Sequence, residues 1–321
     1  MRYVIYGAGA IGATIGGQLF EHGHDVVLIA RGAHLRALQQ DGLRLCDPDR
    51  SRTIRVPTVE DPGVVEWQPD DVCVLGMKTQ DTAAAVEALA GSAPPLITIV
   101  CAQNGVENER LALRHFDGVY GMCVMMPTSH VEPGLVHAYL APPMGVLDVG
   151  RYPRGVDALA EAVAADLTAA GFDGRPSADV MRWKYQKLLV NLGNALTAAC
   201  GPAAREGDLH HRAQAEAMAC FAAAGIEVAT DEEEAEHRSA LAPQRPVEGR
   251  PWPGGSSWQS LARGTGRIET DYLNGEIVLL GRLHGVATPV NAALQRLANE
   301  LARSGAAPGT RTLEDVHRLI A

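Results

Sequence analysis

The sequence predicts an α/β domain over residues 1–172, followed by an all-α domain over residues 173–321. Three observations support this division. A short apolar run at the N-terminus breaks into a glycine-rich turn and then into a helical pattern. Further apolar runs alternate with helical patterns as far as Gly171, which is typical of strands in a parallel sheet. After a connection at residues 174–176 the pattern becomes one helix after another.

The turn that follows the apolar run at residues 3–6 reads Gly7-Ala8-Gly9-Ala10-Ile11-Gly12. A G-x-G-x-x-G pattern between a strand and a helix indicates a Rossmann-type dinucleotide-binding unit. Gly7 permits the tight turn, Gly9 lets the backbone approach a pyrophosphate, and Gly12 lets the helix lie against the strand. The positive N-terminus of the helix would hold the pyrophosphate. The alternative is a βα turn with a purely structural role.

The residue that ends the second strand indicates which dinucleotide is bound. The strand at residues 26–30 is followed by Arg31, nineteen residues after Gly12, and no carboxylate stands beside it. An NAD site usually has Asp or Glu about 20 residues after the glycines, whereas an NADP site has an arginine for the 2′-phosphate. The sequence therefore favours NADP. The alternative for Arg31 is a solvated surface arginine.

The composition is that of an ordinary globular protein, since 46% of the 321 residues are hydrophobic and 21% are charged. The formal net charge of −10 argues against a nucleic-acid partner, because such binding needs a basic face. No apolar run of about 18 residues is present to span a membrane, and we expect no cleavable leader before the first strand. We expect a cytoplasmic protein without a membrane or nucleic-acid partner.

The six cysteines form no C-x-x-C pair, and most of them lie within apolar runs. They are expected to be small core residues in a reducing compartment. Their spacing implies neither a disulfide framework nor a zinc site, so no metal is expected.

Two polar residues follow runs that are predicted to be buried strands. Lys78 comes after the run at residues 72–77, and Asn104 comes after the run at residues 96–102. Open parallel sheets bind ligands beyond the carboxyl ends of their strands, where the glycine turn also lies. Both residues are therefore expected at the dinucleotide edge, although Asn104-Gly105 is also a turn former in its own right.

Only three of the 28 basic residues are lysine, namely Lys78, Lys184 and Lys187. Lysine differs from arginine because its compact charge can release a proton. A predicted helix would place Lys184, Lys187 and Asn191 on one face, with Asn194 seven residues beyond Lys187. The alternative is that this helix face is solvated. Lys184 in particular carries no predicted role.

Two further segments carry structural expectations. Residues 135–140 and 144–149 read as a hairpin-like pair joined at residues 141–143. Residues 243–255 form a Pro- and Gly-rich loop that carries Trp252, and a loop of this length is often a lid or a binding segment.

Taken in order, these motifs resemble the ketopantoate reductases (2-dehydropantoate 2-reductases) over nearly the whole chain. The residues that carry the resemblance are the glycine turn at residues 7–12, Lys78, Gln103-Asn104-Gly105, Lys187-Leu188-Leu189-Val190-Asn191, Leu196-Thr197-Ala198, Ser257 and Glu269-Thr270-Asp271-Tyr272-Leu273-Asn274-Gly275. Each motif alone is weak, whereas the ordered set is specific.

The resemblance implies a role for each of these residues. Lys187 would be the general acid, and Glu269 would be its partner. Arg31 and Lys78 would serve the cofactor, NADP, together with Asn104 at the same edge. The substrate contacts would be Asn104, Asn191, Asn194 and Ser257.

The chain departs from the family pattern in two stretches. Only two residues separate Asn191 from Asn194, where the family usually has three. Gly264 and Gly266 interrupt the helix expected before Glu269, and each costs up to about 1 kcal/mol relative to alanine in a helix.

The expected function is NADPH-dependent reduction of a 2-oxo acid, by default ketopantoate to pantoate. Hydride delivered to the 2-oxo carbon leaves negative charge on oxygen, and an ammonium group both stabilises that charge and supplies the proton. The bulk of Trp252 and Trp258 leaves open a reductase of the same family for a bulkier ketone or a β-hydroxyacid. A non-catalytic NADP-sensing protein is the third alternative, which Lys187 and Glu269 disfavour. The partner is a small-molecule substrate, with homodimer formation left open.

Overall fold

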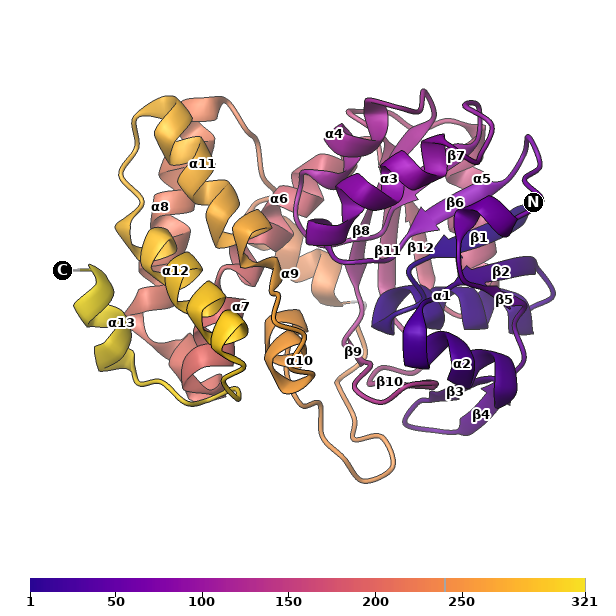
Figure 1. Cartoon of the computed structure of the whole chain (residues 1–321). Helices are drawn as coiled ribbons and strands as arrows, with labels where there is room; N and C mark the ends of the chain where they lie inside the picture. Colours follow the sequence, from indigo (N-terminus) through magenta and orange to yellow (C-terminus); the bar gives the residue numbers. More distant parts are fainter. Residues whose placement is uncertain (240, 321) are drawn as a thin grey trace. The chain divides into compact units, whose positions relative to one another are not determined.

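The computed structural model describes residues 1–239 and 241–320. The chain forms two compact units, one made of Met1–Met181 with Thr230–Trp252 and the other of Arg182–Ala229 with Pro253–Ala321. The first unit is α/β and the second is helical, so the predicted fold class is confirmed (Figure 1).

An eight-stranded sheet lies at the centre of the first unit, in the order β12-β11-β8-β7-β6-β1-β2-β5. Neighbouring strands are parallel except for the antiparallel pair of β8 and β11. The strands are β1 (Arg2–Tyr6), β2 (Asp25–Ile29), β5 (Thr58–Val59), β6 (Val72–Leu75), β7 (Thr98–Cys101), β8 (Val119–Met125), β11 (Val146–Arg151) and β12 (Asp173–Pro176).

Helices cover both faces of this sheet (Figure 1). The helices of the first unit are α1 (Ala10–Glu21), α2 (Gly32–Gln40), α3 (Thr82–Ala90), α4 (Asn108–Leu113), α5 (Ala158–Ala169) and α9 (Asp231–Ser239). Apolar residues of α1 and α5 form one core with Ile5, whereas those of α3 and α4 form another with Val4. Successive residues of a strand point to opposite faces, and both faces of this sheet are covered by helices. A strand such as β6 is therefore buried along its whole length.

A second, four-stranded sheet has the order β4-β3-β10-β9. Its strands are β3 (Leu43–Cys46), β4 (Ser51–Ile54), β9 (Thr128–Ser129) and β10 (Leu135–Ala138). The predicted hairpin-like pairing of residues 135–140 with 144–149 is wrong, because the two segments join different sheets. β10 pairs in parallel with β3, and β11 pairs with β8 and β12.

The second unit consists of helices. They are α6 (Val180–Asn191), α7 (Gly193–Cys200), α8 (Asp208–Ala224), α10 (Ser256–Ala262), α11 (Asn274–His284), α12 (Pro289–Ser304) and α13 (Leu313–Ile320). The single helix expected to carry Lys187, Asn191 and Asn194 is therefore interrupted at Leu192, so that Asn194 lies in the first turn of α7. Short 3-10 turns connect several elements, among them η2 (Thr79–Asp81) and η4 (Glu269–Tyr272).

The compact units differ from the division expected at residue 172 in two respects. Residues 174–176 belong to β12, which pairs with β11, so the expectation that they form only a connection is wrong. In addition, residues 230–252 belong to the first unit, where the His237 Nε2 atom of α9 lies 2.8 Å from Asp148 of β11. A contact across 89 positions of the chain leaves no local pattern in the sequence.

Candidate functional site

Two glycines of the turn after β1 are required by close backbone packing. Gly7 has a φ of +96°, and a Cβ atom there would lie 2.5 Å from the backbone nitrogen of Met77. A Cβ atom on Gly12 would lie 2.3 Å from the Gly7 carbonyl oxygen. Neither position can accept a side chain without moving backbone, so the structural reasons predicted for these glycines are confirmed.

Gly9 differs because a Cβ atom at this position would meet no described atom within 4 Å. This glycine is the N-cap of α1, and no side chain in the described part of the chain caps the helix there. The first N–H groups of a helix have no partner inside the helix, and their dipoles favour an anion. The turn therefore combines open space with a positive helix end, which is the arrangement that a pyrophosphate needs.

His34 of α2, which is distant in the sequence, holds this turn in place through direct hydrogen bonds. Its Nδ1 atom accepts a hydrogen bond from the Gly134 backbone N–H at 2.9 Å. The proton therefore resides on Nε2, which donates to the Ala8 carbonyl oxygen at 2.6 Å. Sequence reasoning missed this positioning residue, because its partners lie 26 and 100 residues away.

Lys78 and Asn104 lie at the carboxyl edge of the sheet, as predicted. Lys78 precedes η2 after β6, and Asn104 follows β7, the next strand in the sheet. The Asn104 carbonyl oxygen accepts hydrogen bonds from Thr79 Oγ1 at 3.2 Å and from Asn108 Nδ2 at 3.0 Å. These bonds hold the two loops together. The loop after β6 is also close to the glycine turn, since a Cβ atom on Gly76 would lie 3.0 Å from the Gly12 Cα atom.

Arg31 is exposed at the N-cap of α2, directly beyond β2. The glycine turn lies beside it, because the backbone N–H groups of Gly7 and Ala8 donate to the Ile29 carbonyl oxygen. Burial raises the pKa of the Tyr6 hydroxyl, and the positive charge of Arg31 acts on it in the opposite direction. Arg31 thus provides an exposed guanidinium group at the edge where the adenosine ribose of a dinucleotide would lie.

In the second unit, the structure brings Asn191, Asn194 and the start of α10 together. Asn194 Nδ2 donates to Asn191 Oδ1 at 3.4 Å, and a Cβ atom on Gly255 would lie 3.3 Å from Asn194 Oδ1. Asn191 and Ser257 are 7% and 1% exposed. Neither Asn191 Nδ2 nor Ser257 Oγ has a hydrogen-bond partner in the described part of the chain. Both atoms are therefore buried polar groups whose bonding capacity is unused.

A buried amide network supports the break between α6 and α7. Asn274 Nδ2 donates to the Leu192 carbonyl oxygen at 3.1 Å and to Asn291 Oδ1 at 3.0 Å. Asn291 Nδ2 in turn donates to Glu216 Oε2 at 2.8 Å. Asn274 and Asn291 are both fully buried, and the carbonyl at a helix break needs such a donor. The network also reaches η4, the turn that carries the buried Glu269, through a 3.4 Å bond between Thr270 and Asn274.

The two lysines of α6 have different environments. Lys187 is half-buried, whereas Lys184 is only 3% exposed. The alternative of a solvated helix face therefore does not hold for Lys184, whose side chain is buried. Its burial could not be predicted from helical spacing, because the tertiary neighbours of a helix face are not encoded in its period.

Replacing Lys184 with arginine is expected to lower the free energy of unfolding by about 1–3 kcal/mol. The planar guanidinium group is larger than the ammonium group, and overpacking a filled site typically has this cost. Urea denaturation of the variant and the unmodified protein measures the difference. An unchanged midpoint and slope would contradict the tight packing of Lys184. Arg303→Lys, at an exposed position of α12, is the control and should leave both values unchanged.

The predicted site residues form two groups that belong to different compact units. The glycine turn, Arg31, Lys78 and Asn104 lie in the first unit. The second unit holds Lys187, Asn191, Asn194, Ser257 and Glu269. The proline- and glycine-rich segment is divided in the same way, since residues 243–252 belong to the first unit and residues 253–255 to the second. Its role as a lid stays a prediction.

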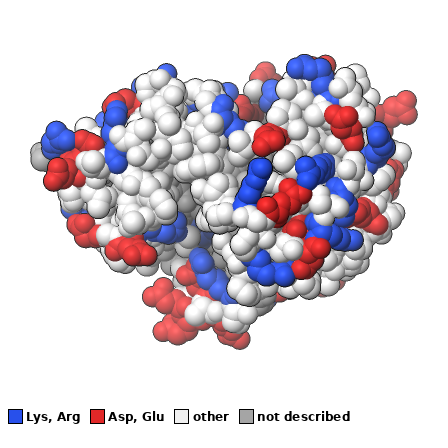
Figure 2. All heavy atoms as spheres, turned by 90° about the horizontal axis from the view of Figure 1, so that it is seen from below, with Lys and Arg blue, Asp and Glu red and all other residues white. Residues whose placement is uncertain are grey.

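None of the helices in the described residues is long and apolar enough to cross a membrane. On the face shown in Figure 2, basic and acidic side chains lie among one another. Exposed ion pairs such as Arg245 with Asp49, at 2.7 Å, reflect this mixing.

Two family profiles together cover most of the chain. Residues 3–153 match the ketopantoate reductase PanE/ApbA family, and residues 179–302 match the C-terminal region of the same family. The chain belongs to the ketopantoate reductase family. This family consists of NAD(P)-dependent oxidoreductases, so the expectation of an enzyme of this type is confirmed.

Individual members of the ketopantoate reductase family are similar over nearly their whole length. A 2-dehydropantoate 2-reductase from Halobacterium salinarum is 30% identical, and the match covers 95% of this chain and 100% of the relative. One from Archaeoglobus fulgidus is 29% identical, over 92% of this chain and 96% of the relative.

Solved structures share the fold. A PanE/ApbA family ketopantoate reductase from Ralstonia eutropha JMP134 has a TM-score of 0.80 at 29% identity, over 95% of this chain and 99% of the other. A D-mandelate dehydrogenase, solved with NADH and anilino(oxo)acetate, has a TM-score of 0.81 at 23% identity, over the same shares of both chains. At that identity the second likeness concerns the fold alone.

Proposed function

We propose that this chain is an NADPH-dependent 2-dehydropantoate 2-reductase, which reduces ketopantoate to pantoate with Lys187 as the general acid. One observation carries the proposal. Asn191 Nδ2 and Ser257 Oγ are buried without hydrogen-bond partners in the described residues. Each such group costs about 1–3 kcal/mol while it is unsatisfied. The carboxylate and hydroxyl groups of a 2-oxo acid such as ketopantoate would satisfy both. The curated relatives carry the name of this activity, which supports the choice of substrate.

The first unit suits the cofactor in this proposal. The open space at Gly9 and the uncapped N-terminus of α1 can accept a pyrophosphate, and Arg31 can pair with a 2′-phosphate. Lys78 and Asn104 lie at the same edge of the sheet and provide a cation and an amide. NADPH, when bound there, supplies the hydride that reduces the 2-oxo carbon.

The second unit provides the groups for proton transfer. Lys187 stands one helical turn before Asn191 on α6, so the ammonium group and the amide can serve the same small molecule. The ammonium group donates its proton to the carbonyl oxygen as negative charge develops on it. Glu269 is 2% exposed, and its carboxylate would hold the ammonium group in position by charge attraction.

Trp258 supports a second candidate, a reductase for a bulkier ketone. This residue follows Ser257 in α10, and its ring lies against Gly254, where a Cβ atom would be 2.8 Å from the Trp258 Cγ atom. An indole on the same helix as Ser257 would offer apolar surface to a larger side chain.

Ketopantoate is expected to support NADPH oxidation by the purified protein with a higher kcat/KM than aryl 2-oxo acids such as benzoylformate. Initial rates of NADPH consumption across 2-oxo acids of increasing size measure this order. A preference for the aryl substrates would favour the second candidate function, a reductase for a bulkier ketone. Tight NADPH binding without turnover of any carbonyl compound would instead favour the sensor hypothesis.

A further inference from the structure

A cysteine, a histidine and a glutamate that are distant in the sequence meet beside the four-stranded sheet. Cys46 ends β3 and His137 lies in β10, and these residues are directly paired in the parallel register of the two strands. Glu248 approaches from the segment at residues 243–252. One potential ligand atom from each of the three side chains lies within 4.8 Å of the others.

The distances are close to those of a tetrahedral metal centre. Cys46 Sγ lies 3.7 Å from Glu248 Oε1, and His137 Nε2 lies 3.7 Å from Glu248 Oε2. Zinc bonds of about 2.3 Å to sulfur and about 2.0 Å to nitrogen or oxygen imply ligand separations of about 3.3–3.6 Å. Small side-chain movements would therefore be enough to surround an ion.

His137 supplies the second, independent observation. It is 8% exposed, and its Nε2 atom has no hydrogen-bond partner in the described residues. Burial lowers the pKa of its imidazole; Arg250 and Arg44 lower it further, whereas Glu248 and Glu132 raise it. A buried ring nitrogen that lies beside a carboxylate and has no hydrogen-bond partner is expected where a ligand belongs.

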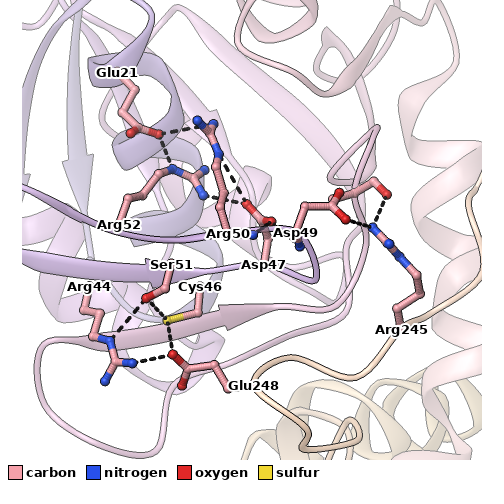
Figure 3. A network of polar contacts seen from close by, with 11 residues as sticks. Glu21, Arg44, Cys46, Asp47, Asp49, Arg50, Ser51, Arg52, Arg245 and Glu248 are labelled. Atoms are coloured by element: carbon pink, nitrogen blue, oxygen red, sulfur yellow. Dashed lines mark hydrogen bonds and ion pairs between the residues drawn. The ribbon is translucent and has the colours of Figure 1, made fainter.

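Glu248 is held in place by its neighbours, as Figure 3 shows. Its Oε1 atom accepts a hydrogen bond from the guanidinium group of Arg44, so Oε2 faces His137. The same segment is tied to the turn between β3 and β4 through Arg245, which donates to Asp49 Oδ1 at 2.7 Å. Glu248 itself has a φ of +49°, which is unusual for a residue other than glycine. Its carboxylate is thus oriented by an ion pair and a tight turn.

We propose that Cys46, His137 and Glu248 form a zinc site, with solvent as the fourth ligand at the exposed side of Glu248. A thiolate with an imidazole selects zinc over the oxygen-binding cations magnesium and calcium. The thiolate and the carboxylate balance the charge of the ion. Binding displaces the thiol proton to solvent, so affinity rises with pH. The bound ion fastens residues 243–252 to the four-stranded sheet, at the part of the chain that leads into the second unit.

The test uses the full-length protein, treated with a chelator and kept reduced with a phosphine. Titration with Co²⁺ is expected to produce a thiolate-to-cobalt charge-transfer band and d–d bands of tetrahedral intensity, and stoichiometric Zn²⁺ should abolish them. Zn²⁺ should also raise the midpoint of thermal unfolding. The matched controls are Cys200→Ser, at a partly exposed cysteine, and His115→Gln, at an exposed histidine, and both should retain the bands.

The variants Cys46→Ser, His137→Gln and Glu248→Gln are expected to weaken Zn²⁺ binding by more than about 100-fold, since even outer partners of metal ligands contribute about 10- to 100-fold. Glu248→Gln is the variant least prone to disturb folding, because the Glu248 side chain is 35% exposed to solvent. Absence of the charge-transfer band in the unmodified protein would overturn the proposal. Bands that persist in Cys46→Ser but vanish in Cys200→Ser would overturn it equally.

Discussion

Replacing Lys187 with arginine is expected to lower the turnover of ketopantoate by about 10²- to 10⁴-fold, which is the usual contribution of a positioned general acid. Arginine keeps the positive charge and much of the length, but its guanidinium group does not release a proton at accessible pH. NADPH affinity should barely change, because the glycine turn and Arg31 belong to the other compact unit. Steady-state kinetics and NADPH fluorescence titration separate the two quantities.

The control for Lys187→Arg is an exchange at an exposed position, because a buried position would change stability as well. Lys184→Arg is unsuitable, since Lys184 is buried and its replacement is expected to affect stability. Arg303→Lys makes the converse exchange at an exposed position of α12 and should leave turnover unchanged. Near-normal reduction of ketopantoate by Lys187→Arg would show that the general acid is another residue.

Features that depend on neighbouring residues could be predicted from the sequence. The glycine turn was predictable because its requirements, a positive φ at Gly7 and close approach at Gly12, arise within a few residues. The capping box of α9 is similar. The Thr230 backbone N–H donates to Glu233 Oε2 at 2.7 Å, and the Glu233 N–H donates to Thr230 Oγ1 at 3.2 Å. The rule that ligands bind beyond the carboxyl ends of parallel strands placed Lys78 and Asn104 at the correct edge of the sheet.

Features that depend on distant strands could not be predicted in this way. The pairing of β10 with β3 competes with the hairpin that its short connection to β11 suggests, and only the whole sheet decides between them. The same pairing brings Cys46 beside His137, so cysteine spacing alone gave no indication of a metal site. The break at Leu192 depends on Asn274, which lies 82 residues away and supplies the hydrogen bond to its carbonyl. Helical spacing therefore placed Asn191 and Asn194 on one helix instead of two.

Replacing Arg31 with alanine is expected to weaken NADPH binding by about 10- to 100-fold and to leave NADH binding nearly unchanged. A charge-assisted hydrogen bond is worth about 1.5–3 kcal/mol, and only NADPH carries the 2′-phosphate that a guanidinium group can bind in a bidentate manner. Dissociation constants for both cofactors, measured by fluorescence at fixed ionic strength, give the change in preference. Arg36→Ala, on the same helix and also exposed, is the matched control and should preserve the preference for NADPH. Equal affinity of the unmodified protein for the two cofactors would refute the role of Arg31, because the 2′-phosphate would then contribute nothing to binding.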